Sequence, residues 1–314
     1  MIQPKPAFLE KMQELMPDKE DFEKYKKIIH TLPPKSIRCN KIKISPKELK
    51  QKLEEKWKVS QPFKQYPEIM IIQSELEPGE LGKSIEHLLG YYYVQEISSM
   101  LPILALKPKP GETLLDLCAS PGSKTTQAAA EMQNKGFIHA NDKDLGRIII
   151  LNSNLERTGI TNQIVTKERG EILSKRLADK NIKFDKILLD VPCSGEGTCR
   201  SSPKTFIMWN PKMIDKLSRI QLKLAREAIK LLKKQGEVLY STCTHSPEEN
   251  ELIVNQLLEE FPLEILPISL PLKTRKGITQ WKGKQLNKEI EKAVRIYPQD
   301  NNTEGFFLCK MRLK

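Results

Sequence analysis

From about residue 84 onward, short apolar runs alternate with longer segments in which Leu, Ile and Ala recur at helical spacing. The apolar runs are six to eight residues long, a typical length for a buried strand. Alternating strands and amphipathic helices are typical of a parallel sheet with helices on both faces. The pattern predicts strands at residues 113–119, 137–142, 163–168, 185–191, 236–242 and 306–313. It predicts helices at residues 124–133, 144–159, 211–236 and 246–261. Ser246, followed three residues later by Glu249, predicts a capping box at the start of the last helix.

The first 80 residues have a different pattern. They are rich in lysine, interrupted by proline and irregular, apart from one helical segment. In that segment Ser45 can cap a helix in which Leu49 and Leu53 recur at helical spacing. Strand-like runs at residues 36–44 and 68–73 flank the helix, so we expect a small α+β unit.

These two patterns predict two domains. Pro78 and Gly79, which stand among acidic residues, are typical of a linker. We therefore expect an N-terminal α+β domain over residues 1–80 and a doubly wound, Rossmann-like α/β domain over residues 81–314.

Ligands of an open parallel sheet bind beyond the carboxyl ends of the central strands, so residues at those ends carry the candidate chemistry. The first such end is DLCASPGSKT, where Pro121, Gly122 and their small neighbours let the backbone approach a ligand. The segment lacks the G-x-G-x-x-G pattern, and its likeness to a phosphate loop leaves phosphate binding as an alternative. At the next strand end, Asp142 can accept both hydroxyls of a ribose, as in nucleoside-carrying cofactors. A solvated or capping aspartate is the alternative.

Two cysteines follow two further strand ends. Cys193 lies in LLDVPCSGEG, just after Asp190, and Cys243 lies in LYSTCT. Because adjacent strands lie about 4.8 Å apart, these three side chains can converge on one reacting group. Buried structural cysteines are one interpretation, and a cysteine hydrolase with His245 as its base is a second. In the third, a thiolate adds to an electron-poor ring while a carboxylic acid supplies a proton to the ring nitrogen.

The composition points to a polyanionic partner. The net charge of +12 and the pI near 9.2 favour nucleic acid, with a lysine-rich solvated surface as the alternative. The six cysteines lack the spacing of a zinc knuckle or a redox couple, so we expect no metal site. The N-terminus does not resemble a signal peptide, and no apolar run approaches the roughly 20 residues of a membrane span. We therefore expect a cytoplasmic protein with reduced thiols and no membrane contact.

Six ordered segments resemble motifs of the Nop/Sun family of RNA cytosine-5 methyltransferases. Three of them carry the strand ends described above, and they read LLDLCASPGSKTTQ, LLDVPCSGEGT and YSTCTHSPEENE. The flanking three are RCNKIK (38–43), YYYVQEISSMLP (91–102) and RIYPQDNNTEGFFLCK (295–310). The resemblance covers residues 36–314 and implies a class I methyltransferase sheet that binds S-adenosylmethionine.

The resemblance also implies which residues bind this cofactor. The loop around its methionine and sugar would consist of Cys118, Ala119, Ser120, Pro121, Gly122, Ser123 and Lys124. Asp142 would hold the ribose, and Asp190 would lie near the methionine amine and the target base. Arg147 matches a basic position of the family. At the third strand end Glu168 would face the adenine amine, unless Arg169 occupies that place.

In this family the cysteine of the TC pair, here Cys243, is the nucleophile. It would attack carbon 6 of cytosine while protonated Asp190 stabilises ring nitrogen 3, so that carbon 5 takes the methyl group. A base then removes the carbon 5 proton and the thiol is eliminated, and the resemblance assigns Cys193 to this release. Lys124 lies close enough in sequence to touch the pocket. The target nucleotide must be flipped out or unpaired, because its base cannot be reached inside a stack.

The first motif is expected to contribute to RNA binding. Arg38, Asn40, Lys41 and Lys43 would extend the basic surface along the RNA, with a scaffold lobe that exposes lysines as the alternative. The family acts on transfer RNA or ribosomal RNA, and we favour transfer RNA because the chain has no obvious extra RNA-binding module. We expect a monomer. A non-catalytic RNA-binding or assembly protein with a relict cofactor site is the alternative of a different class.

Overall fold

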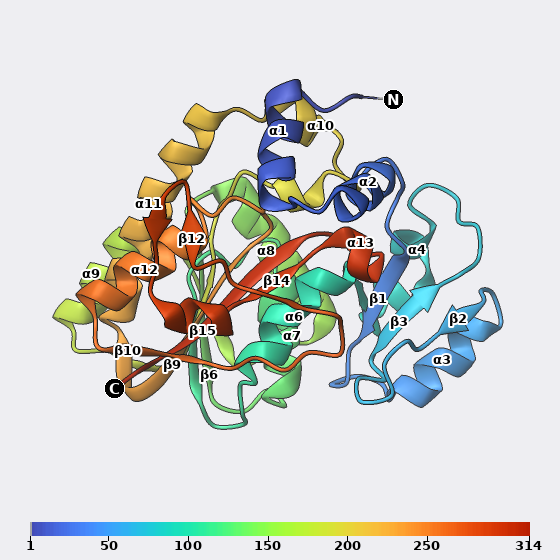
Figure 1. Ribbon diagram of the computed structural model, residues 1–314. Helices are drawn as coiled ribbons and strands as arrows, with labels where there is room; N and C mark the ends of the chain where they lie inside the picture. The colour runs from blue at the N-terminus through green and yellow to red at the C-terminus, as the bar shows by residue number, and fades with distance from the viewer. Residues whose placement is uncertain (1) are drawn as a thin grey trace.

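The computed structural model describes residues 2–314 and contains two main sheets (Figure 1). The larger sheet has the order β11-β14-β15-β9-β8-β5-β6-β7, and β10 also pairs with β15. Its central strands β9, β8, β5, β6 and β7 are parallel, whereas β15 runs antiparallel beside β9. Its strands are β5 (Thr113–Asp116), β6 (Phe137–Asp142), β7 (Gln163–Lys167), β8 (Phe184–Asp190), β9 (Leu232–Thr242), β10 (Leu263–Leu266), β11 (Arg275–Lys276), β14 (Val294–Ile296) and β15 (Phe306–Leu313).

Helices cover both faces of this sheet, which confirms the predicted doubly wound α/β fold. On one face Leu114 and Leu188 pack against α6, α7 and α8, and on the other Leu115 and Leu189 pack against α9, α11 and α12. Adjacent strand residues therefore point to opposite faces, and both faces are apolar. The helices are α6 (Ile97–Leu106), α7 (Ser123–Glu131), α8 (Leu145–Thr158), α9 (Gly170–Asp179), α11 (Pro211–Ile229) and α12 (Glu251–Glu260).

The smaller sheet is antiparallel, in the order β2-β3-β1-β4, and α3 covers one of its faces. The predicted cap of α3 is confirmed, because Ser45 and Glu48 form a capping box there. Strand β4 pairs with β1, so this sheet includes a segment that follows residue 80 in the chain. Its elements are β1 (Lys35–Cys39), α3 (Pro46–Glu54), β2 (Val59–Ser60), β3 (Ile69–Ile72) and β4 (Tyr92–Val94), and the link to β4 holds α4 (Glu80–Lys83) and α5 (Ile85–Leu88).

The chain begins with two helices that the hydrophobic pattern did not predict. They bury only a few apolar residues among many charged ones, so their periodic signal is short. Phe8 and Met12 of the first pack with Phe206 and Trp209, far from the small sheet. In Figure 1 these two N-terminal helices lie beside α10 in the upper part of the molecule. These elements are α1 (Pro6–Leu15), α2 (Lys19–Ile28) and α10 (Lys204–Met208).

Several predicted boundaries near the functional strands are wrong. Strand β5 ends at Asp116 rather than at residue 119, and helix α11 ends at Ile229 rather than at residue 236. Strand β9 begins at Leu232 rather than at residue 236, because α11 ends at Ile229 and a tight turn follows. Helix α12 begins at Glu251, so Ser246 and Glu249 do not form its capping box. Both side chains are instead fully buried in the turn that precedes the helix. The remaining short elements are η1 (Glu196–Thr198), β12 (Gln280–Trp281), β13 (Lys284–Gln285), η2 (Lys288–Lys292) and α13 (Pro298–Asn301).

Residues 2–314 contain neither a membrane-spanning helix nor a cluster of metal ligands. None of the helices is both long and apolar enough to cross a lipid bilayer. Over the same residues, no group of three or more His, Cys, Asp or Glu side chains is placed to hold a metal ion.

Candidate active site

The two cysteines predicted at strand ends lie in contact. Strands β8 and β9 are parallel neighbours, with Asp190 opposite Ser241. The loops that leave them bring the sulfur of Cys193 to 3.1 Å from the sulfur of Cys243. The hydrogen bond to Cys243 and burial hold the pKa of the Cys193 thiol well above its usual range. Cys193 therefore keeps its proton and can donate a hydrogen bond to the sulfur of Cys243.

A carboxylate and an ammonium group lie beside the thiols. The Oδ2 atom of Asp190 lies 2.7 Å from the Nζ atom of Lys124, and its Oδ1 atom accepts a hydrogen bond from Ser241 at 2.9 Å. Lys124 also donates to the Ser99 hydroxyl at 3.2 Å and lies over the ring of Phe306, 5.6 Å from its centroid. Burial acts to lower the pKa of Lys124, but the charge of Asp190 outweighs it and raises that pKa. The ammonium group therefore stays protonated within the site.

The predicted cofactor loop forms a small cavity next to this ion pair. Gly122 has a φ of +103°, and a Cβ atom there would lie 2.9 Å from Leu151, so the loop requires glycine. The residues around the cavity are Asp116, Cys118, Ala119, Ser120, Pro121, Ser123, Lys124 and Asp190.

Asp116, at the end of β5, has a buried carboxylate in this cavity. Its Oδ2 atom accepts a hydrogen bond from Thr125 at 2.7 Å, whereas its Oδ1 atom has no partner within residues 2–314. Burial raises the pKa of Asp116 from 3.8 to about 7. An unpartnered buried carboxylate oxygen fits the cationic amine of S-adenosylmethionine, so the residues present suit this cofactor.

Asp142 and Arg147 lie at the next strand end. Asp142 is buried, and its Oδ2 atom lies 3.1 Å from the Nε atom of Arg147. Arg147 also donates to the carbonyl oxygen of Ser120 at 2.6 Å, and the Ser120 hydroxyl donates to the carbonyl oxygen of Arg147 at 2.7 Å. These contacts join the ribose candidate to the cofactor loop, although neither Asp142 nor Arg147 lines the small cavity.

Glu168 and Arg169, the two candidates for the adenine contact, do not line the small cavity. The Oε2 atom of Glu168 lies 3.0 Å from Arg176, and its Oε1 atom accepts a hydrogen bond from the backbone of Arg169. The Arg169 side chain is exposed and pairs with Glu171. The structure therefore does not bring Glu168 or Arg169 to the cavity that Cys118 to Lys124 surround.

Of the four residues predicted for the RNA surface in the first motif, only Lys41 and Lys43 are exposed. Arg38 and Asn40 are both 3% exposed, so the prediction that they extend a surface along the RNA is wrong. Asn40 donates to the carbonyl oxygens of Gly90 and Thr158, and Arg38 reaches α7. Lys41 pairs with Glu131, and Lys43 donates to the carbonyl oxygen of Arg157. The motif therefore joins the small sheet to α7 and α8, because buried carbonyl groups there need donors.

His245 does not act with Cys243 as a hydrolase would require. Its buried ring stacks on Tyr297, with centroids 4.8 Å apart and planes 3° apart, and meets the edge of Tyr25. Burial lowers the pKa of His245 to about 3, so the ring is neutral. His245 is a packing residue in this structure.

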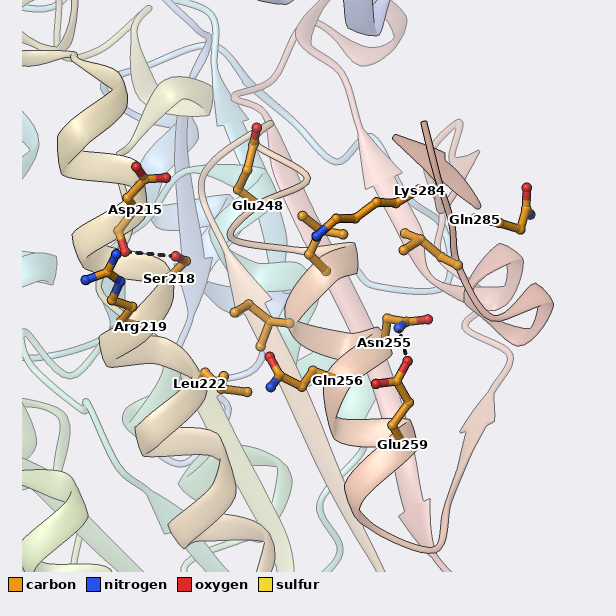
Figure 2. A pocket seen from close by; sticks show the side chains of 13 residues that line it. Asp215, Ser218, Arg219, Leu222, Glu248, Asn255, Gln256, Glu259, Lys284 and Gln285 are labelled. Carbon is orange, nitrogen blue, oxygen red and sulfur yellow. Dashed lines mark hydrogen bonds between the residues drawn. The ribbon is translucent and has the colours of Figure 1, made fainter. Parts of the chain in front are cut away.

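A larger cavity lies away from these residues. It has a volume of about 680 Å³ and opens between α11 and α12. Figure 2 shows its polar lining, with Arg219 on α11, Glu259 on α12 and Lys284 on the β12–β13 hairpin. It contains none of the predicted site residues.

Four residues of the site were missed or given no role by the sequence patterns. Ser99 and Phe306 contact Lys124, Ser241 contacts Asp190, and Asp116 lines the cavity. Ser99 and Phe306 lie within segments that carry the family resemblance, so inspecting small and aromatic residues of those motifs could have found them.

Comparisons with known proteins agree with this site. A family model described as 16S rRNA methyltransferase RsmB/F matches residues 103–312, and one described as the N-terminal domain of 16S rRNA methyltransferase RsmF matches residues 5–97. Over 296 residues the chain is 40% identical to tRNA (cytosine(49)-C(5))-methyltransferase of Pyrococcus abyssi, covering 94% of the chain and 92% of that protein. Over 312 residues it is 37% identical to ribosomal RNA small subunit methyltransferase F of Aliivibrio salmonicida, covering 98% of the chain and 63% of that protein.

Solved structures give the same result. A methyltransferase homologue from Pyrococcus horikoshii has a TM-score of 0.82 at 32% identity, covering 99% of this chain and all of that one. NSun6 from the same organism, solved with SFG, has a TM-score of 0.82 at 25% identity, covering 98% of each chain. The predicted resemblance and the predicted cofactor, S-adenosylmethionine, are confirmed. The chain therefore belongs to the RsmB/F family of S-adenosylmethionine-dependent RNA methyltransferases.

Proposed function

We propose that the protein methylates carbon 5 of a cytosine in transfer RNA, with Cys243 as the nucleophile. The observation that carries this proposal is the contact between the sulfurs of Cys193 and Cys243, with the Lys124–Asp190 ion pair beside them. A thiolate beside a proton-donating pair is what nucleophilic addition to a pyrimidine ring requires.

Each of these side chains has a proposed step. Cys243 forms a bond to carbon 6 of the cytosine, and its electron pair moves into the ring. A proton from Lys124 passes through Asp190 to ring nitrogen 3, because both oxygens of Asp190 accept hydrogen bonds before the base enters. When bound, S-adenosylmethionine supplies a methyl group on a positively charged sulfur. After a base takes the carbon 5 proton, the thiol of Cys193 donates to the departing sulfur of Cys243 and stabilises it.

Roles in cofactor binding are also proposed. Asp116 would pair with the amine, Asp142 would hold the ribose, and the segment from Cys118 to Lys124 would enclose the methionine part. Arg147 would support both by its bonds to Asp142 and to the backbone of Ser120.

Transfer RNA is the proposed substrate because of the likeness in sequence to a relative named for it. The chain is 40% identical to that archaeal transfer RNA methyltransferase and 37% identical to the ribosomal RNA methyltransferase F from Aliivibrio salmonicida. Ribosomal RNA is the second candidate, because the two matching family models are described as 16S rRNA methyltransferases. The net charge of +12 suits either polyanion. We also propose that the protein is a monomer and that it acts in the cytoplasm.

The test is a methylation assay with radiolabelled cofactor on purified transfer RNA and on 16S ribosomal RNA, in parallel. We expect transfer to transfer RNA by the natural protein and none by Cys243→Ala. Bisulfite sequencing of the product would identify the cytosine. Equal incorporation by Cys243→Ala would overturn the role of Cys243, and incorporation into ribosomal RNA alone would overturn the substrate.

A further inference from the structure

A buried hydrogen bond joins the two thiol loops directly behind the thiols. Ser194 follows Cys193, and Thr244 follows Cys243. The hydroxyl oxygens of Ser194 and Thr244 lie 2.7 Å apart. Both side chains are buried, at 7% and 1% exposed. The link thus ties the residue after Cys193 to the residue after Cys243.

Each end of the link meets a carboxyl group. The Oε1 atom of Glu249 contacts the Ser194 hydroxyl, and the Oε2 atom of Glu196 lies 3.0 Å from the Thr244 hydroxyl. Both glutamates are fully buried. Four oxygen atoms thus form a row, from Glu249 through Ser194 and Thr244 to Glu196.

Counting protons in this row shows that one glutamate is neutral. The row contains three oxygen–oxygen contacts, but the two hydroxyl groups supply only two protons. The third proton must lie on a carboxyl group, because two lone pairs at such a distance in a buried site would repel.

The surroundings show which glutamate carries the proton. Glu196 lies 3.4 Å from the ammonium group of Lys11 and accepts a hydrogen bond from Trp209 at 2.7 Å, so its surroundings favour a carboxylate that only accepts. Within residues 2–314, no ion pair includes Glu249, so Glu249 is the member of the row that can carry the extra proton. Its Oε1 atom contacts the Ser194 hydroxyl, and its Oε2 atom accepts from the Ser194 backbone at 3.0 Å and from Gln221 at 2.8 Å.

We propose that Glu249 is a positioning residue of the methyltransferase site, whose proton starts a directed row of hydrogen bonds that holds Cys193 and Cys243 in contact. In this row Glu249 donates to Ser194, Ser194 to Thr244, and Thr244 to Glu196. Loss of the Glu249 proton leaves one contact without a hydrogen, so the loops separate. This deepens the function proposed above and rests on it.

The groups around Glu249 favour its neutral form. Its titratable and charged neighbours are Cys193 after β8, Glu196 in η1 and Tyr240 on β9, and none of these is a cation. Burial raises the pKa of Glu249 to about 7, in agreement with the proton count. The row is therefore intact below neutral pH and is lost as the pH rises through about 7.

The first test measures how close the thiols lie, without RNA or cofactor. Diamide oxidises the two thiols to a disulfide and takes up their two electrons and two protons, and peptide mapping gives the rate of the Cys193–Cys243 bond. Glu249→Gln keeps a donor and an acceptor and should stay within about twofold of the natural protein. Glu249→Ala should be at least about tenfold slower. Glu259→Gln, at an exposed residue of α12, is the matched control.

The second test uses pH. The ratio of the rates of natural protein to Glu249→Gln should be constant below pH 7 and fall above it, because glutamine cannot ionise. If Glu249→Gln is as slow as Glu249→Ala, or if the ratio does not change with pH, the proposal is wrong.

Two further variants test the proposal independently of whether Glu249→Ala folds. Ser194→Ala and Thr244→Val remove the central hydroxyl link and should slow disulfide formation as Glu249→Ala does. Unchanged rates in both would also overturn the proposal. Since this assay involves no methyl transfer, its outcome is independent of whether transfer RNA is the substrate.

Discussion

The guanidinium group of Arg38, on the small sheet, donates to the carbonyl oxygen of Ser123, in the cofactor loop, at 2.7 Å. It also donates to Gln95 at 2.5 Å and to Thr126 at 2.8 Å. Burial lowers the pKa of Arg38 to about 10, so the group stays charged at neutral pH. The small sheet thus fixes the start of α7, where the cofactor loop ends.

Arg38→Met is therefore expected to weaken cofactor binding although Arg38 does not line the cavity. Each acceptor left unpaired costs about 1–3 kcal/mol, and we expect an affinity about tenfold lower, or about 1.4 kcal/mol. Isothermal titration with S-adenosylmethionine measures this. Lys41→Met is the control, since it removes ion pairs with Glu131 and Glu68 but no contact with the cofactor loop, and it should bind the cofactor normally.

Cys193→Ala is expected to accumulate a covalent protein–RNA adduct. Cys243 can still bond to the base, but its departing thiolate loses the hydrogen bond from the neighbouring sulfur 3.1 Å away. A denaturing gel of the variant with labelled RNA should show a slow band that the double variant with Cys243→Ala lacks. Free RNA alone in the single variant would contradict the role of Cys193.

The Lys124–Asp190 pair is expected to act as one unit. Lys124→Met and Asp190→Asn should each lower the single-turnover rate by about 100-fold to 10,000-fold, as expected for loss of a proton donor. Because the two groups share one proton path across 2.7 Å, the double variant should be little slower than either single variant. Rate losses that multiply in the double variant would show two independent roles.

Cofactor affinity is expected to fall at acid pH because of Asp116. Burial raises its pKa to about 7 in the free protein, and a bound cation requires the ionised form. The dissociation constant should therefore rise by about tenfold for each pH unit below 7, and change little above it. For the free protein the sign follows from the raised pKa: Asp116 favours folding below pH 4, and this stability is lost as the pH rises through about 7.

The Asp116→Asn variant tests both the pH dependence of cofactor affinity and the pH dependence of stability. Its cofactor affinity should be low and independent of pH between 5.5 and 7, as titration in matched buffers would show. Its thermal stability should also fall less than that of the natural protein as the pH rises from 5 to 8. A natural protein whose affinity is flat over this range would exclude Asp116 as the partner of the amine.

The RNA-binding surface is expected to include the exposed lysines of the small domain. Lys52 on α3, Lys58 before β2 and Lys64 after it are exposed. Replacing all three by alanine should weaken RNA binding and reduce the slope of log Kd against log salt by up to about 0.7–0.9 for each phosphate that is no longer neutralised. Lys180→Ala with Lys234→Ala, exposed near the starts of β8 and β9 and so at the ends of these strands opposite the thiols, should leave the slope unchanged.

The strand pattern predicted most of the large domain because its central strands β5, β6 and β8 are buried on both faces. Strands β5 to β8 start within one residue of their predicted starts. A strand inside the sheet appears as a continuous apolar run, so the start of the run marks the start of the strand. The proximity of Asp190, Cys193 and Cys243 could also be predicted, because neighbouring parallel strands end at the same edge of a sheet. Periodicity failed for α1 and α2, which bury few residues and pack on distant parts of the chain.

Polar contacts inside the protein could not be predicted in this way. A charge in the sequence suggests a solvated surface, yet Arg38 is buried because backbone carbonyls of α7 face it. Glu249 followed Ser246 at the spacing of a capping box, but long-range partners, Ser194 and Gln221, hold it instead. Such partners lie 28 and 55 positions apart in the chain, beyond any local pattern.

Segments from both ends of the chain hold the loop that carries Cys193. Lys11, on α1, reaches Glu196 in that loop, and the backbone of Gly305, just before β15, donates to Gly197 at 2.8 Å. A ribosome must therefore have synthesised the chain past Gly305 before both contacts can form. A nascent chain that stops short of Gly305 should accordingly leave the loop of Cys193 without one of its two supports.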